Sequence, residues 1–210
     1  WCLITYPAED ALVDGDGLMS RRIGEVVAAA STSFVAQCYE LYAAPPLGSF
    51  VRTGMPAVYG IVYQGTTEPM DSTRPVLARG QGLETEEELQ HNNPQLSRLF
   101  TTRFEALIAG FSVEDSYKQY LPPLPPAVHS FAYTCTPDEV ARFTASLEFL
   151  PLLLNSGLPV ADELVGACLR GAATAQGDGS AFLFRASRAL AGQLSGDVPR
   201  LTAILRRVAP

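Results

Sequence analysis

Hydrophobic and polar residues alternate in short runs along the first two thirds of the chain, a pattern typical of β-strands. The clearest run covers residues 34–39, where Phe34, Ala36 and Cys38 fall on one face of a strand. The pattern predicts strands at 23–29, 34–39, 49–52, 58–63, 102–111 and 116–121, a strand-like segment at 127–135, and an edge strand at 3–6. Glycine, proline and small polar residues separate these runs. Short strands punctuated in this way predict a compact antiparallel barrel of the six-stranded type.

The last third of the chain changes to the repeat of amphipathic helices. An apolar stripe with spacings of three and four consists of Val140, Phe143, Leu147, Leu150 and Leu154. Residues 136–139 combine a threonine cap, a first-turn proline and a glutamate, so the helix is expected to begin there. Pro151 is expected to kink it. Further helices are predicted at 159–170, at 181–194 and after Asp197. Four amphipathic helices indicate a small α-helical bundle.

The barrel pattern is interrupted between residues 65 and 100. Thr85 precedes three glutamates and fits a capping box that opens a short helix, and Asn93-Pro94 begins another. The predicted fold is therefore α+β, a small antiparallel β-barrel followed by a C-terminal α-helical bundle. The predicted divisions are a lead-in at 1–21, a barrel at 22–135 with a helical insertion at about 84–100, and a helical domain at 136–210.

The barrel segment resembles a known family. The residues that carry the resemblance are Ile23-Gly24, 31–34, 46–49, 59–62 and 66–69. Their order is similar to the HAS barrel, the module shared by HerA helicases and rotary ATP synthase subunits. Residues 22 to about 135 resemble stand-alone HAS-barrel proteins of the cyanobacterial type more closely. The resemblance implies a non-catalytic barrel that mediates assembly around an ATPase ring, although this chain has no counterpart of the ATPase domain.

Charge and composition exclude several classes of function. The chain carries 15 basic and 22 acidic residues, a net charge of −7, so it lacks the basic footprint that a nucleic-acid partner requires. Lys118 is the one lysine and no Gly-Lys pair occurs, which excludes a Walker A loop. The most apolar run, residues 149–154, is too short to span a bilayer. Membrane association is therefore expected only through a partner.

Candidate chemistry is sparse. His91 and His129 have no cysteine or carboxylate at metal-binding spacing, and no nucleophile motif occurs, so no catalytic residue, metal or cofactor is predicted. Two alternatives stay open: a thiolate–imidazolium pair of His129 with Cys135, and an anion cradle at 177–180. A structural role is the favoured interpretation of each. Residues 14–17 indicate an Asp-Gly turn rather than a calcium loop.

The four cysteines lie far apart in the sequence, without a Cys-x-x-Cys pair. Metal-binding knuckles need close pairs, and small secreted scaffolds carry more cysteine. The cysteines are therefore expected to be reduced thiols in a cytoplasmic protein.

Two classes of function remain. The favoured class is a non-enzymatic assembly or interaction protein that docks through the barrel and helical tail onto a protein partner, possibly an ATPase or another multisubunit assembly; a homo-oligomer also fits. Its candidate contact residues are Tyr39, Tyr42, the prolines Pro122, Pro123, Pro125 and Pro126 of a stiff polyproline arm, and Arg206 and Arg207. The alternative is a small-molecule-binding protein or hydrolytic enzyme with a site at the barrel–helix junction, near Arg103, Glu105 and His129.

Overall fold

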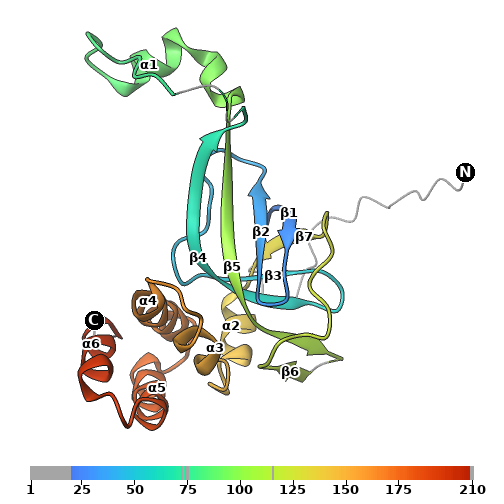
Figure 1. Ribbon diagram of the computed structural model, residues 1–210, viewed down its shortest axis with the longest axis vertical. Helices are drawn as coiled ribbons and strands as arrows, with labels where there is room; N and C mark the ends of the chain where they lie inside the picture. The colour runs from blue at the N-terminus through green and yellow to red at the C-terminus, as the bar shows by residue number, and fades with distance from the viewer. Residues whose placement is uncertain (1–19, 72, 74–75, 115, 209–210) are drawn as a thin grey trace, which may run out of the picture.

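The computed structural model describes residues 20–71, 73, 76–114 and 116–208. Within them, six strands close an antiparallel barrel (Figure 1): β1 (Arg22–Ala29), β2 (Ser33–Cys38), β3 (Phe50–Thr53), β4 (Val58–Pro69), β5 (Phe100–Val113) and β7 (Phe131–Thr134). Hydrogen-bonded neighbours follow the order β2-β1-β7-β3-β4-β5, and β5 pairs back onto β2. The α+β class and the six-stranded barrel predicted from the sequence are confirmed. The predicted edge strand at 3–6 and the turn at 14–17 lie outside the described residues.

The barrel interior is filled by the apolar face predicted from the alternation. Phe34, Ala36 and Cys38 of β2 are all buried, and Phe34 packs edge-on against Phe104 of β5 at 6.4 Å between ring centroids. Gly60 of β4 lies against the Phe34 ring, where a Cβ atom would approach the ring to 2.8 Å. A glycine is therefore required where β4 bends across the interior.

The predicted last barrel strand at 116–121 is wrong. β6 (Ser116–Lys118) pairs with the end of β5 outside the closed ring, and β7 provides the sixth barrel strand. The chain leaves β6 after Lys118 because the Gln119 side chain is held by the helical region, donating to the carbonyl oxygen of Phe143. The segment at 127–135, predicted only as strand-like, contains the strand that closes the barrel.

β4 and β5 are longer than predicted and form a hairpin that projects from the barrel (Figure 1). The extra residues of β4, from Gln64 onward, are polar and pair with β5 along its first residues. Without a buried face they give no alternating apolar pattern, which is why the sequence did not predict them. Helix α1 (Glu86–Asn92) and the 3₁₀ helix η1 (Pro94–Arg98) lie at the tip of this hairpin.

Five helices follow the barrel: α2 (Pro137–Phe143), α3 (Leu150–Leu154), α4 (Ala161–Thr174), α5 (Gly179–Gln193) and α6 (Val198–Val208). The single helix predicted from residue 137, kinked at Pro151, is wrong, because it stops at Phe143 and resumes at Leu150. Pro151 lies in the first turn of α3 instead of inside a longer helix. The capping box of α2 is confirmed: the Thr136 hydroxyl accepts from the Glu139 N–H, and the Glu139 carboxylate accepts from the Thr136 N–H.

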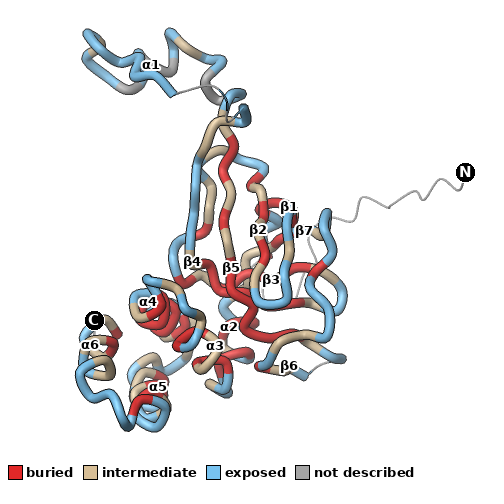
Figure 2. Tube along the Cα trace, in the orientation of Figure 1, coloured by how far each residue is buried: buried red, intermediate tan, exposed pale blue. Residues whose placement is uncertain are grey.

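The helices cover the outer face of β3, β4 and β5 with a second apolar core (Figure 2). Phe50, Tyr59 and Leu107 point outward from these strands and pack among buried helical side chains such as Phe143 and Leu164. No helix among the described residues is long and apolar enough to cross a membrane.

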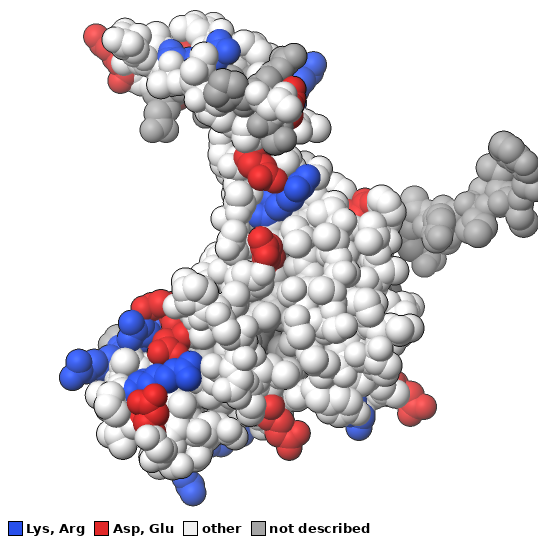
Figure 3. Space-filling view, viewed as in Figure 1, with Lys and Arg blue, Asp and Glu red and all other residues white. Residues whose placement is uncertain are grey.

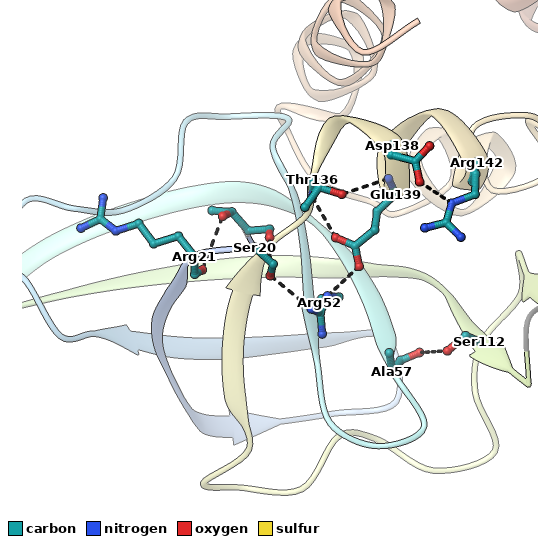
Figure 4. Close-up of polar contacts among 10 residues, drawn as sticks. Ser20, Arg21, Arg52, Ala57, Ser112, Thr136, Asp138, Glu139 and Arg142 are labelled. Carbon is teal, nitrogen blue, oxygen red and sulfur yellow. Dashed lines mark hydrogen bonds and ion pairs between the residues drawn. The ribbon is translucent and has the colours of Figure 1, made fainter. Parts of the chain in front are cut away.

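A buried ion pair joins the barrel to the first of these helices (Figure 4). Arg52 of β3 approaches the Glu139 carboxylate of α2, with 2.7 Å between Nε and Oε1. Nε makes no aligned hydrogen bond, so the contact is mainly electrostatic. The same guanidinium lies 4.8 Å from the centre of the Tyr133 ring and donates to the Ser20 hydroxyl at 3.2 Å. These contacts fix the start of α2 against the barrel wall.

Candidate interaction surface

Exposed apolar side chains gather at one end of the barrel, around the β3–β4 turn and the segment between β5 and β7. This barrel-end patch consists of Met55, Val113, Tyr120, Leu124 and Val128. Met55 is 97% exposed and Leu124 76% exposed. Isolated exposed apolar residues are ordinary on protein surfaces, but several large ones on neighbouring segments make a candidate contact site.

The loops that carry the barrel-end patch are held by defined contacts. Tyr120 packs edge-on against the barrel residue Phe111, with ring centroids 5.4 Å apart. The N–H of Ser112 donates to the carbonyl oxygen of Ala57 at 2.8 Å, which joins the end of β5 to the β3–β4 turn. The Ser112 hydroxyl donates to the same oxygen at 3.5 Å (Figure 4). A Cβ atom on Gly54 would lie 4.0 Å from the Cβ of Pro126, so the turn and the polyproline arm are neighbours. The patch is therefore assembled from three segments that lie together.

The polyproline arm displays Leu124 on a restrained backbone. Pro126 is buried and Leu121 packs against the barrel core, so both ends of the arm are anchored. Pro123 and Pro125 flank Leu124 and are exposed, and Pro122 is half-buried. Because proline fixes the backbone angle φ, Leu124 loses little conformational freedom when a partner covers it. The four prolines named from the sequence thus lie within or beside the barrel-end patch.

The two tyrosines named from the sequence lie elsewhere. Tyr39 and Tyr42 follow β2, at the end of the barrel where β1 begins, and both are exposed. The guanidinium of Arg22 lies over the Tyr39 ring at 5.7 Å and over the Phe131 ring at 4.8 Å. The Tyr42 N–H donates to the Thr102 hydroxyl at 2.8 Å. The Tyr39 hydroxyl and the His129 ring both contact the Glu25 carboxylate, so this aromatic cluster lies next to the end of the arm that carries Val128.

Arg206 and Arg207 lie in the last turn of α6, in the helical region. Arg206 is exposed, whereas Arg207 pairs with the Glu163 carboxylate and donates to the Ala203 carbonyl oxygen at 2.7 Å. Arg207 therefore serves to join α6 to α4. The structure does not bring the tyrosines, the prolines and the arginines into one surface.

The barrel–helix junction considered as an alternative site is filled by the second apolar core. Arg103, Glu105 and His129, expected near it, point to other partners and are not part of that core. Arg103 pairs with Glu68 at 3.1 Å, Glu105 accepts from the Tyr63 hydroxyl, and His129 contacts the Glu25 carboxylate. These groups do not converge on a common site.

His129 and Cys135 do not form the pair considered from the sequence. The His129 ring is exposed against Glu25, whereas Cys135 follows the far end of β7 and its N–H donates to the Phe50 carbonyl oxygen at 3.0 Å. Burial raises the pKa of the Cys135 thiol well above its ordinary value, and Glu139 raises it further. A catalytic thiol requires a lowered pKa. Cys38, Cys135 and Cys168 are all free thiols.

The loop at 177–180 is occupied by its own acidic residue. Asp178 caps α5, with its carboxylate accepting from the Ala181 N–H at 2.9 Å. An anion at this helix start would meet a negative charge already in place, so the anion-cradle alternative is not supported. Among the described residues, no group of three or more His, Cys, Asp or Glu side chains is arranged to hold a metal ion.

In comparisons with known proteins, no family model matches this chain and no curated protein sequence does so either. The resemblance to the HAS barrel therefore remains a prediction from the sequence. The sequence predicted the polyproline arm, which contains Leu124, as a contact segment, but it did not predict Met55, Val113, Tyr120 or Val128. The available signal for Met55 was a large apolar residue inside a predicted turn, where polar residues are usual.

Proposed function

We propose that this chain is a non-enzymatic assembly or interaction protein that docks onto a larger complex through the barrel-end patch. The observation that carries the proposal is the exposure of Met55 and Leu124 on anchored loops. The backbone that carries these side chains is restrained before binding, so a partner gains their burial without the entropic cost of ordering the loops.

The chemistry of the patch defines the partner surface. Its five members are apolar or aromatic, and burying one such side chain contributes about 1.5–3 kcal/mol. Figure 3 shows a largely uncharged barrel between the charged hairpin tip and the charged helices. The matching surface is therefore an apolar face of a folded protein, not a phosphate backbone.

The resemblance to the HAS barrel supports an ATPase or another multisubunit assembly as the complex. The widely spaced cysteines support a cytoplasmic location, because the described ones are free thiols. The purified chain alone is expected to hydrolyse no ATP, since its sequence has no Gly-Lys pair to hold the phosphates. ATP turnover that persists through repeated purification would contradict the non-enzymatic proposal.

The proposal is tested by capture from a lysate of the native host with the full chain as bait. The wild type is compared with Met55→Asp and Leu124→Asp, and with Val198→Asp as the matched control. Val198 is also an exposed apolar residue, but it lies on α6. The wild type and the control are expected to capture a stoichiometric partner. The amount of that partner captured by either patch variant should be at least tenfold lower. Equal capture by all four proteins would contradict the proposed site.

A further inference from the structure

Helix α5 has an outer face that nothing in the described chain covers. Its inner face buries Phe182, Ala186 and Leu190. On the outer face Phe184 is 67% exposed, and Arg185 and Arg188 beside it are also exposed. No carboxylate among the described residues forms an ion pair with either arginine. The Arg185 guanidinium lies over the edge of the inner face, 5.8 Å from the centre of the Phe182 ring. Exposed aromatic rings and arginines are the residue types enriched at the centre of protein interfaces.

The charge of the chain is divided unevenly. Residues 136–210 contain 7 of the 22 acidic and 7 of the 15 basic residues, so the whole net charge of −7 belongs to residues 1–135. Within residues 179–208 the balance is positive, with five arginines and Asp197 as the one acidic residue. Three of these arginines lie on α6, where Arg200 pairs with Asp162 and Arg207 with Glu163. The basic charge of α5 itself is that of Arg185 and Arg188.

The complementary acidic group lies at the opposite end of the molecule. Glu84, Glu87 and Glu88 are exposed at the start of α1, on the tip of the projecting hairpin (Figure 1). The start is fixed locally, because the Thr85 hydroxyl accepts from the Glu88 N–H at 3.2 Å and the Glu88 carboxylate accepts from the Glu84 N–H at 3.1 Å. None of these three carboxylates forms an ion pair with a described basic residue.

We propose that the α5 face of one copy binds the acidic start of α1 in a second copy. The hairpin tip and α5 lie at opposite ends of the folded molecule in Figure 1, so the two surfaces cannot meet within one molecule. The exposed Val76 and Leu77 of the hairpin insertion supply apolar surface for Phe184. The contact joins two different surfaces, so it is heterologous and repeats head to tail, closing into a ring or extending into a filament.

Every copy of the chain carries both the acidic and the basic surface, so a second copy is the expected partner. Ion pairs at an exposed interface are screened by salt, so the association is expected to weaken as ionic strength rises. The proposal is independent of the barrel-end patch, which lies on other segments of the chain.

Sedimentation of the full chain measures the association. At 50 mM salt and about 100 µM protein we expect oligomers that dissociate at 500 mM salt. The variants Arg185→Glu/Arg188→Glu and Glu84→Arg/Glu87→Arg should each be monomeric, because each places like charges opposite one another. A control variant, Lys118→Glu/Arg206→Glu, changes the net charge by the same amount as the α5 variant and should still associate.

The decisive step is to mix the two monomeric variants. In the mixture the acidic α5 face of one variant meets the basic hairpin tip of the other, so association should return. A wild type that is monomeric at both salt concentrations, oligomers that survive in either double variant, or a mixture that stays monomeric would each overturn the proposal. Met55→Asp should leave self-association unchanged, which separates this test from that of the proposed function.

Discussion

At the residue scale, one side chain holds the break between α2 and α3. Gln119 donates to the carbonyl oxygens of Phe143 (2.5 Å) and Ser146 (3.0 Å), and its own amide oxygen accepts from the Phe149 N–H at 3.1 Å. These backbone groups lack helical partners because the helix stops there. The break was not predictable from residues 137–154 alone, since the residue that satisfies it belongs to the segment after β6.

Gln119→Ala should therefore destabilise the protein strongly. It leaves the buried Phe143 carbonyl oxygen and the buried Phe149 N–H without a partner, whereas the carbonyl oxygen of the exposed Ser146 can bind water. We expect a loss of about 3 kcal/mol in the free energy of unfolding. Gln64→Ala is the matched control, because Gln64 is exposed and makes one long contact with Thr66. It should change stability by less than about 0.5 kcal/mol. Urea unfolding measures both, and equal effects would show that Gln119 does not hold the break.

Cys38 predicts how stability depends on pH. Burial raises the pKa of its thiol to about 11, whereas the thiol of the unfolded chain titrates near its ordinary value of 9.0. Between these values the unfolded chain has released a proton that the folded chain keeps, so the free energy of unfolding falls as pH rises.

Cys38→Ala should remove this contribution. Between pH 9 and pH 11, the free energy of unfolding of this variant should fall by about 2 kcal/mol less than that of the wild type. Urea unfolding at pH 8, 9, 10 and 11 gives the slope for each protein. Parallel pH profiles for variant and wild type would show that the Cys38 thiol does not titrate in this way.

At the scale of elements, strands with one buried face were predictable and those without one were not. The alternation in β2 located its inner face, whereas the polar part of β4 beyond Val62 carried no such pattern. β6 was predicted as the last barrel strand in place of β7 for a different reason. Closure depends on which strand pairs with both β1 and β3, and local sequence does not specify this. The barrel-end patch was likewise only partly predictable, because it joins segments far apart in the chain.

The contact between α4 and the barrel depends on Gly48. Its backbone has φ of +83°, and a Cβ atom would lie 2.5 Å from the Cys168 backbone nitrogen. Gly157 has a similar φ of +74° but nothing within 4 Å of the added atom. The two positions therefore separate backbone strain from loss of close packing.

Gly157→Ala should cost about 1 kcal/mol from the left-handed backbone conformation alone. Gly48→Ala should cost at least about 2 kcal/mol more, because α4 must move away from the barrel. Thermal unfolding of both variants, compared with wild type, measures the difference. Equal costs would show that α4 is not packed against Gly48.

At the scale of the whole molecule, the barrel has an apolar core of its own and shares a second core with the helices. Removal of residues 137–210 should therefore leave a folded barrel that exposes Phe50, Tyr59, Ile61 and Leu107 and self-associates at moderate salt. Circular dichroism and gel filtration of the truncated chain test this. A truncated chain without β-structure would show that the two cores fold only together.

The central claim is that the barrel-end patch binds a partner, and hydrogen–deuterium exchange on the captured complex tests it most directly. Compared with the free chain, the complex should show slower amide exchange at residues 53–57 and in the non-proline residues of 120–130. The aromatic cluster around Tyr39 should exchange at the same rate in both. Protection confined to that cluster or to α6, with residues 53–57 and 120–130 unchanged, would contradict the account.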